Sequence, residues 1–382
     1  MVVSPDPIPG PGPEARARSD ALAARIRDEI ASSPEGSIPF SRFMERALYE
    51  PGLGYYSGGA AKFGPAGDFV TAPEVSPLFG RCVGRQIAEV LSALGGGGVL
   101  ELGAGTGSLA RAALDELADM GRMPEWTILE PSPELRQRQA AGLAGRVAWA
   151  DRLPAGFRGV ILANEVADAL PVDRFLVDGG DVRELAVGLE EGRLAWRSRP
   201  ANPALEMQVR EVLDPPAWPD GYTSEVRPAL GAWIGELANA LHQGLILLAD
   251  YGLPRREYYA PQRSDGTLIC HYRHRAHGDP FLWPGLQDIT AWVDFTRVAE
   301  AGTDAGLTLE GFTPQSAFLA GTGLPAMVAG EEDPNRRARV ANEARQLTLP
   351  GEMGERFRVM GLSRGLAPPL SGFGQVDLAR RL

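Results

Sequence analysis

The chain has 382 residues, of which 44% are hydrophobic and 23% are charged, a composition typical of a folded, water-soluble protein. A formal charge of −11 argues against nucleic acid as the main partner, because phosphate binding needs clustered basic residues. Only Cys82 and Cys270 are present, too few for a disulfide framework, and they predict a reducing compartment such as the bacterial cytoplasm. No apolar run is long enough to span a bilayer, so the sequence predicts no membrane insertion.

The N-terminal quarter of the chain predicts two regions. Residues 1–18 are rich in Pro and Gly and predict a flexible leader. Ser19 is the expected N-cap of a helix over Ala21–Ala31, with which a helical N-terminal region of residues 19–95 begins. This region holds a long loop rich in Gly, Pro and aromatic residues, and loops of that length usually cover a functional site.

From residue 96 to residue 382 short apolar strands alternate with helices, which predicts an α/β fold with a mostly parallel sheet. The predicted strands are Val99–Leu102, Glu125–Glu130, Gly159–Asn164, Leu245–Asp250, Leu307–Phe312 and Arg356–Leu362. The predicted helices are Ser108–Met120, Pro133–Gly145, Pro228–Gln243 and Phe295–Gly306. Two insertions, at about 176–226 and 254–294, interrupt this rhythm. Alternating apolar residues in the first predict a β-hairpin, which is either a subunit contact of a homodimer or part of a rim.

The strongest local signal is a strand, a glycine-rich turn and a helix within residues 99–120. The glycines of the turn are Gly103, Gly105 and Gly107. Glycines let the backbone approach a ligand closely, and such a turn at the carboxyl edge of a parallel sheet is where open α/β folds bind ligands. Glu101 precedes the turn, and Glu130 ends the next strand, where a carboxylate can bind the hydroxyls of a ribose. The spacing favours a nucleoside with a cationic amino-acid tail, such as S-adenosylmethionine. NAD and a ligand-free turn of packing glycines are the alternatives.

Polar residues also follow the apolar run that ends at Ala163. Asn164, Glu165 and Asp168 come after it, at the strand end expected to face the methyl group of such a donor. Two carboxylates suit a guanidinium, because each pairs with its planar fork of donors. We interpret Glu165 and Asp168 as groups that orient an arginine acceptor, with a helix cap or a solvated acid as the alternative for Asp168. Asp151 is a candidate for contact with the adenine amine, and an ordinary surface acid is the alternative.

Three of the four histidines, His271, His274 and His277, are spaced by three residues. On a helix they would share one face, which raises the question of a metal site. Arg273 and Arg275 stand between them, and no carboxylate or thiolate has a metal-binding spacing, so no metal is predicted. His271 and His274 are predicted to line a substrate cleft, with a structural role as the alternative.

Several segments together resemble the MidA-like class I S-adenosylmethionine-dependent methyltransferases, relatives of the mitochondrial complex I assembly-factor arginine methyltransferase. The matching segments, which extend over residues 38–365, are Ile38–Met44, Gly54–Tyr56, Lys62–Gly64, Gly67–Glu74, Glu101–Gly107, Asn164–Val172, Asp250–Gly252, Gly266–Leu268, Pro284–Thr290, Val293–Phe295, Thr313–Leu319 and Gly354–Met360. The glycine turn alone indicates only a methyltransferase, whereas Gly67–Glu74 and Asn164–Val172 together are much more specific. The sequence departs from the family at Asp173, where many relatives have His.

The resemblance implies a Rossmann-like methyltransferase core with a mostly parallel seven-stranded sheet, an N-terminal helical cap and insertions. It implies that the glycine turn and Glu130 hold S-adenosylmethionine, with Asn164 and Glu165 close to the transferred methyl. The loop that contains Phe69, Thr71 and Glu74 would fold over the site; we assign the first two to the donor and Glu74 to the acceptor.

Aromatic residues of the N-terminal region are the last candidates. Tyr55 and Tyr56, with Phe63 and Phe69, are predicted to shield the cleft and to lie against the sulfonium or the guanidinium. Packing of a long loop on the core is the alternative.

The leading hypothesis is a methyltransferase that acts on an arginine of a client protein. The alternatives are an assembly factor without catalytic activity and a methyltransferase for a small molecule or another residue type.

Overall fold

The structure, a computed structural model, describes residues 8–58, 71–143, 145–214, 217–367 and 369–382. The chain divides into two compact units, and each is described by itself. The first unit comprises Met1–Phe69, Asp168–Leu230 and Arg255–Trp292, and the second comprises Val70–Ala167, Gly231–Pro254 and Val293–Leu382. Nearly all of the two predicted insertions therefore belongs to the first unit. Over the described ranges, no helix has both the length and the apolar character needed to cross a membrane.

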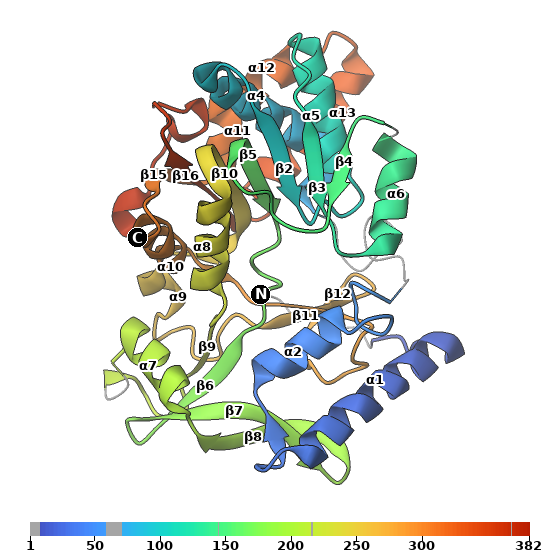
Figure 1. Ribbon diagram of the computed structural model, residues 1–382, viewed down its shortest axis with the longest axis vertical. Helices are drawn as coiled ribbons and strands as arrows, with labels where there is room; N and C mark the ends of the chain where they lie inside the picture. Colours follow the sequence, from blue (N-terminus) through green and yellow to red (C-terminus); the bar gives the residue numbers. More distant parts are fainter. Residues whose placement is uncertain (1–7, 59–70, 144, 215–216, 368) are drawn as a thin grey trace. The chain divides into compact units, whose positions relative to one another are not determined.

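The second unit is built on one sheet, whose strands in spatial order are β15, β16, β10, β5, β2, β3 and β4, with the short β14 beside β10 (Figure 1). Their bounds are β2 Gly98–Leu102, β3 Trp126–Leu129, β4 Ala148–Ala150, β5 Phe157–Asn164, β10 Leu241–Leu253, β14 Val293–Asp294, β15 Thr308–Pro314 and β16 Phe357–Arg364. The strands from β10 to β4 are parallel, and β16 is antiparallel to both of its neighbours. The predicted mostly parallel, Rossmann-like sheet is confirmed.

Helices cover this sheet on both faces. They are α3 Ala72–Val75, α4 Pro77–Leu94, α5 Ser108–Asp119, α6 Pro133–Leu143, α8 Leu230–Ala240, α10 Phe295–Asp304, α11 Gln315–Gly321, α12 Leu324–Ala329 and α13 Pro334–Thr348, followed by the 3₁₀ turns η2 Ser371–Phe373 and η3 Ala379–Arg381. Leu245 and Leu247 pack into one hydrophobic core with α4 and α5, and Ile246 between them points to the opposite face. There α10 packs closely, since a Cβ at Gly302 would lie 2.8 Å from Leu362. Figure 1 shows α4 and α5 near β2, and α8 and α10 near β10.

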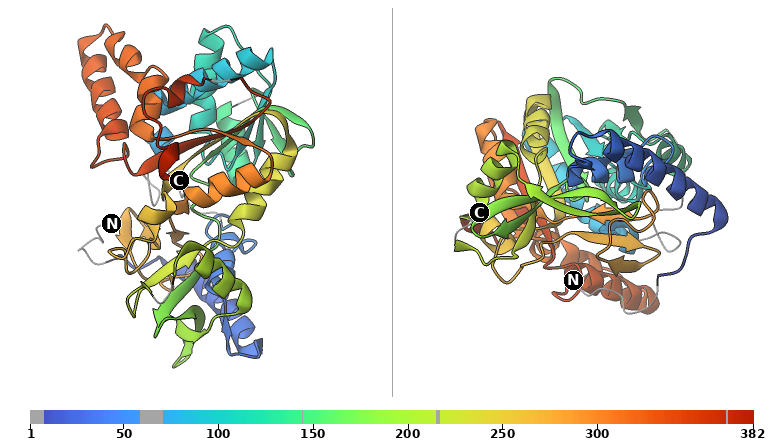
Figure 2. Two further views of the ribbon diagram at one scale, coloured as in Figure 1. Left: turned by 90° about the vertical axis from the view of Figure 1, so that its left-hand side faces the viewer. Right: turned by 90° about the horizontal axis from the view of Figure 1, so that it is seen from below.

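The first unit contains two small antiparallel sheets and a helical layer, and Figure 2 shows it in two further views. Its elements are α1 Pro13–Ser32, β1 Ser37–Ile38, α2 Phe40–Tyr49, β6 Asp173–Asp178, β7 Asp181–Glu190, β8 Arg193–Pro200, α7 Pro203–Val212, β9 Thr223–Val226, α9 Arg255–Tyr258, β11 Ile269–Tyr272, β12 Arg275–His277 and β13 Asp288–Thr290. The predicted hairpin is confirmed as β7 and β8. Its apolar side chains, including Val187 and Trp196, pack with α1 and α2.

Two expectations for the N-terminal quarter differ from the structure. Helix α1 begins at Pro13, where proline suits the first turn, and Ser19 lies inside the helix rather than capping it. The Ser19 hydroxyl instead donates a hydrogen bond to the Pro284 carbonyl at 2.9 Å. Helices α3 and α4, which the sequence placed in the N-terminal region, belong to the second unit because α4 packs lengthwise on α5.

Candidate functional site

A turn of three glycines joins β2 to α5 at the carboxyl edge of the sheet. Gly103, Gly105 and Gly107 have φ angles of +58°, +54° and +81°, a region that glycine enters without the steric cost of a Cβ atom. Gly107 is also the N-cap of α5, and an added Cβ there would lie 2.9 Å from Leu143 Cδ1. The turn therefore requires glycine for both backbone and packing reasons.

Glu101 lies on β2, separated from Gly103 of the turn by Leu102, and is 2% exposed. Its Oε2 accepts a hydrogen bond from Trp126 Nε1 at 3.0 Å. The pKa of Glu101 is raised to about 8, mainly by burial and also by the nearby Glu130 carboxylate, against the Trp126 bond, which acts to lower it. At neutral pH the Glu101 carboxyl is therefore mostly protonated.

Glu130 directly follows β3 and is also buried. One carboxylate oxygen accepts the Ser132 N–H at 3.0 Å, and the other accepts Gln139 Nε2 at 3.3 Å. Gln139, on α6, donates to the Gly105 carbonyl at 2.9 Å and accepts Trp149 Nε1 at 2.8 Å. One buried amide thus connects the glycine turn, Glu130 and β4.

The turn after β5 is strained and fixed. Glu165 has a φ of +52°, which is unusual for a residue with a Cβ atom, and its N–H donates to the Ala249 carbonyl at 2.9 Å. Asn164 Nδ2 donates to Glu165 Oε1 at 3.3 Å. Asn164 Oδ1 is buried and has no hydrogen-bond partner among the described residues. Because buried acceptors are normally satisfied, this oxygen indicates a ligand donor at the strand end.

Sequence reasoning missed two residues that build this edge. Asp250, near the end of β10, accepts the Ala167 N–H at 3.0 Å and so holds the turn that contains Glu165. Gln139 is fully buried on the apolar stripe of α6, four residues from both Leu135 and Leu143. A polar residue on such a stripe needs hydrogen-bond partners, and that is the signal that could have identified Gln139.

Glu74 on α3 contacts the glycine turn. Its Oε1 accepts hydrogen bonds from the hydroxyls of Thr106 and Ser108, the latter at 2.9 Å. The sequence assigned Glu74 to the acceptor, whereas these contacts lie beside the predicted donor residues.

The other predicted donor residues are Thr71, Phe69 and Asp151. Thr71 is the N-cap residue of α3, and Phe69, like Phe63, lies outside the described residues. Asp151 has a side chain 87% exposed and forms an ion pair with Arg136 at 2.6 Å. A donor contact for Asp151 stays a prediction.

The predicted acceptor tyrosines belong to the first unit. Tyr55 is buried in its hydrophobic core. The Tyr56 hydroxyl donates to Asp288 Oδ1 at 3.0 Å, and its ring stacks on Tyr49 with ring centroids 5.5 Å apart. Tyr49 in turn donates to the Ala169 carbonyl at 2.9 Å, which connects these rings to the segment after Asp168.

Asp168 is the first residue of the first unit after β5 and is 6% exposed. The pKa of Asp168 is raised to about 6, mainly by burial, and the Arg227 charge acts in the opposite direction. The alternative of a helix cap or a solvated acid is wrong, because no helix follows Asp168 and water does not reach most of it.

The histidines lie on a β-hairpin, so the helical face considered from their spacing is wrong. His271 is on β11, His274 is in the turn with a φ of +60°, and His277 ends β12. Burial lowers the pKa of His271 to about 4, which keeps its imidazole neutral. Within the described part of the chain, no group of three or more His, Cys, Asp or Glu side chains is arranged to hold a metal ion.

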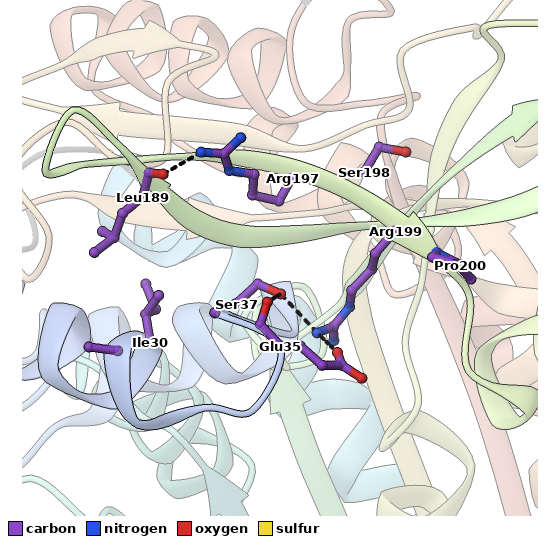
Figure 3. A pocket seen from close by; sticks show the side chains of 10 residues that line it. Ile30, Glu35, Ser37, Leu189, Arg197, Ser198, Arg199 and Pro200 are labelled. Carbon is purple, nitrogen blue, oxygen red and sulfur yellow. Dashed lines mark hydrogen bonds and ion pairs between the residues drawn. The ribbon is translucent and has the colours of Figure 1, made fainter.

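A separate cavity of about 720 Å³ lies in the first unit, where the end of α1 and β1 meet the β7–β8 hairpin (Figure 3). Arg199 extends from β8 toward Glu35 and Ser37, and Arg197 donates to the Leu189 carbonyl. None of the residues predicted for the donor or the acceptor lines this cavity.

A model of the S-adenosyl-L-methionine-dependent methyltransferase family matches residues 82–313 of the chain. The chain is also similar to proteins named protein arginine methyltransferase NDUFAF7, mitochondrial. The Danio rerio protein is 28% identical, with 90% of this chain and 90% of that protein covered. The Homo sapiens protein is 27% identical, with 86% and 80% covered.

Two solved structures from Burkholderia thailandensis are similar over almost the whole chain. One, bound to S-adenosyl-homocysteine, is 44% identical with a TM-score of 0.93, and the match covers 98% of this chain and 100% of that chain. The other, a native structure, is 43% identical with a TM-score of 0.91 and the same coverage.

The residues of the second unit fit an adenosyl donor. The glycines of the turn carry no side chains, Glu130 provides a buried carboxylate for ribose hydroxyls, and Asn164 provides a buried oxygen that is unpaired among the described residues. S-adenosylmethionine is therefore the cofactor that agrees with the family match, with the similar ligand-bound structure and with this geometry. The chain belongs to the S-adenosylmethionine-dependent methyltransferase family.

Proposed function

We propose that this methyltransferase acts on a side-chain nitrogen of an arginine in a client protein. The names of the NDUFAF7 relatives support this substrate class. The turn of Asn164 and Glu165 is the observation that carries the proposal, because the Asn164 Nδ2 donates to the Glu165 carboxylate and holds these two side chains together at the end of the central strand β5.

An arginine offers what this turn accepts. A guanidinium presents a planar fork of N–H donors, which pairs well with a carboxylate and has no acceptor of its own. Glu165 provides the carboxylate, and Asn164 Oδ1 provides a second acceptor that is buried and unpaired among the described residues. The backbone position of Glu165 is fixed by two hydrogen bonds. Its N–H donates to the Ala249 carbonyl, and the Ala167 N–H that follows donates to Asp250.

S-adenosylmethionine supplies an electrophilic methyl group on a sulfonium sulfur. Methyl transfer would break the S–CH₃ bond, form the N–CH₃ bond and leave S-adenosyl-homocysteine, and the proton lost by the arginine nitrogen would pass to the Glu165 carboxylate. The guanidinium pKa lies above about 12, so Glu165 orients the nitrogen and stabilises its charge rather than removing the proton beforehand. Alignment of the nucleophile is the main contribution expected from such a site.

We also propose a cytoplasmic location and a client protein as the partner. Both cysteines, Cys82 and Cys270, are free and buried thiols, a state that suits a reducing compartment.

The test uses purified protein, a native protein extract and S-adenosylmethionine labelled on its methyl group. Mass spectrometry of the hydrolysed protein fraction should show the label in methylarginine. Glu165→Gln should lower this rate about 10²- to 10⁴-fold, while the affinity for S-adenosyl-homocysteine stays within about twofold. Glu125→Gln, at an exposed acid of the same unit just before β3, is the matched control and should keep the rate.

Three outcomes would contradict the proposal in different ways. Label in small molecules or in another residue type would show that the acceptor is not arginine, although the chain is still a methyltransferase. An unchanged rate in Glu165→Gln would remove Glu165 from the mechanism. A protein that binds donor and client but transfers no label would favour the assembly factor without catalytic activity.

A further inference from the structure

A single buried amide, that of Gln139, makes hydrogen bonds with the glycine turn, with Glu130 and with β4. Its Nε2 donates to the Gly105 carbonyl at 2.9 Å and to Glu130 Oε2 at 3.3 Å. Its Oε1 accepts Trp149 Nε1 at 2.8 Å, and the side chain is fully buried. The three partners lie in three different segments: Gly105 follows β2, Glu130 follows β3, and Trp149 belongs to β4.

We propose that Gln139 is a positioning residue for the methyl donor: it holds the Glu130 carboxylate and the Gly105 backbone in the orientation that binds the ribose of S-adenosylmethionine. Gln139 acts through these two groups.

Glutamine is suited to this position because the site needs a donor and an acceptor at once. The amide nitrogen carries two hydrogens, which match the two acceptors, the Gly105 carbonyl and Glu130 Oε2. The indole N–H of Trp149 requires an acceptor on the other side, and this fixes which way the amide points. A flipped amide would place its oxygen against two acceptors and its nitrogen against a donor.

The consequence for Glu130 is a fixed carboxylate plane. The Ser132 N–H holds one oxygen at 3.0 Å, and Gln139 holds the other. A group that is already oriented loses less entropy when a ligand binds, so its contacts yield more affinity. Loss of the Gln139 bond should therefore weaken the recognition of the ribose hydroxyls in particular.

The experiment measures binding to the full chain by titration calorimetry, with S-adenosyl-homocysteine and its 2′-deoxyribose analogue as probes. Gln139→Met keeps the volume of the side chain and removes its hydrogen bonds. We expect the variant to bind S-adenosyl-homocysteine about tenfold more weakly, since a hydrogen bond to a charged group is lost. We expect it to bind the deoxy analogue almost as well as the wild type does, so the preference for the ribose hydroxyl falls.

Gln86→Met is the matched control. Gln86 is fully buried in the same unit, and its amide accepts the Gly372 N–H at 2.9 Å and donates to Glu89 at 2.8 Å, with no bond to the glycine turn or to Glu130. It should lower the melting temperature by a similar amount and leave the preference for the ribose hydroxyl unchanged.

A double-mutant cycle with Glu130→Gln distinguishes positioning from stability alone. If Gln139 acts through Glu130, the double variant should bind S-adenosyl-homocysteine no more weakly than Glu130→Gln does. Additive losses, or equal weakening of both ligands in Gln139→Met, would overturn the proposal.

Trp149→Phe provides a second test in case Gln139→Met does not fold. This change removes the donor that fixes the amide and leaves Gln139 itself in place. It should reduce the preference for the ribose hydroxyl in the same direction by a smaller factor, about twofold to fivefold. An unchanged preference in Trp149→Phe would contradict the proposal.

Discussion

In the second unit the buried acids Glu101 and Glu130 at the carboxyl edge of the sheet are held by neutral donors, whereas the buried Glu50 of the first unit pairs with arginines. Glu101 is held by the Trp126 indole, and Glu130 by a backbone N–H and the Gln139 amide. In the first unit Glu50 pairs with Arg25 at 2.7 Å and with Arg46. Neutral donors fix the direction of a carboxyl group and add no positive charge beside it, whereas arginines fix its direction and add that charge.

A second comparison between the units concerns groups of the backbone and the side chains next to them. The turns after β2 and β5 in the second unit have positive φ angles, and Asn164 Oδ1 there has no partner among the described residues. In the first unit Arg227 donates to the carbonyls of Asp168, Leu170, Ala291 and Trp292, at 2.7–3.1 Å. Its guanidinium joins two segments of the unit that are distant in sequence. We infer that the polar groups at the second unit's edge serve ligand binding, and that Arg227 serves the folding of the first unit.

The largest expected effect tests this inference at Gly107. Gly107→Ala should weaken S-adenosyl-homocysteine binding more than a hundredfold, because the new Cβ would lie 2.9 Å from Leu143 and the turn would have to move. Gly121→Ala is the matched control at the other end of α5. Gly121 also has a positive φ, +71°, but a Cβ there meets nothing within 4 Å. It should cost about 1–2 kcal/mol of unfolding free energy and keep donor affinity.

Titration calorimetry and thermal melts of both variants separate the two effects. Equal losses of affinity in the two variants would mean that backbone strain alone, and not the position of the turn, determines donor binding.

The opposite pattern is expected for Arg227→Met in the first unit. The variant leaves several carbonyl groups without their donor. The free energy of unfolding of this unit should therefore fall by about 3 kcal/mol or more. Donor affinity should stay within about twofold of the wild type. Arg210→Met, which removes only an exposed pair with Glu206, should change the stability by less than about 0.5 kcal/mol. A tenfold loss of donor affinity in Arg227→Met would break the comparison between the units.

Local chemistry in the sequence was sufficient to predict the strands and helices next to the glycine turn. Apolar runs, glycines and an acid at the next strand end repeat at regular spacing, so the βα order and the turn with Gly103, Gly105 and Gly107 could be read directly. Ser132 shows how such a local signal works: it precedes Pro133, the first residue of α6, and its hydroxyl accepts the Leu135 N–H as an N-cap.

What the sequence did not show depends on contacts between distant residues. Ser19 has the pattern of an N-cap, but its hydroxyl bonds to Pro284, which no local pattern reveals. The histidine spacing fits a helix equally well, and only the pairing of Cys270 with His277 makes the segment a hairpin. Asp250 and Gln139 gain their importance from partners on other elements; the apolar stripe of α6 can mark Gln139 as unusual, but no local pattern shows which groups it bonds to.

The smallest expected effect concerns pH and compares one acid from each unit. Burial raises the pKa of Glu101 to about 8 from its ordinary value of 4.5, so the folded state binds the proton more tightly and wild-type stability falls as pH rises between those values. Burial also acts to raise the pKa of Glu50, but its bonds to Arg46 and Arg25 outweigh burial and lower it, so this contribution to stability is lost as pH falls below about 4.5.

Glutamine at either position does not titrate and reveals the sign of each contribution. The melting temperature of Glu101→Gln, relative to the wild type, should rise by a few degrees between about pH 5 and pH 8, because each kcal/mol shifts it by about 2–4 °C. Glu50→Gln should be less stable than the wild type at neutral pH, and this gap should narrow in acid. Parallel curves for the two variants would contradict the contrast, because they would mean that neutral donors and arginines hold buried carboxylates in the same protonation state.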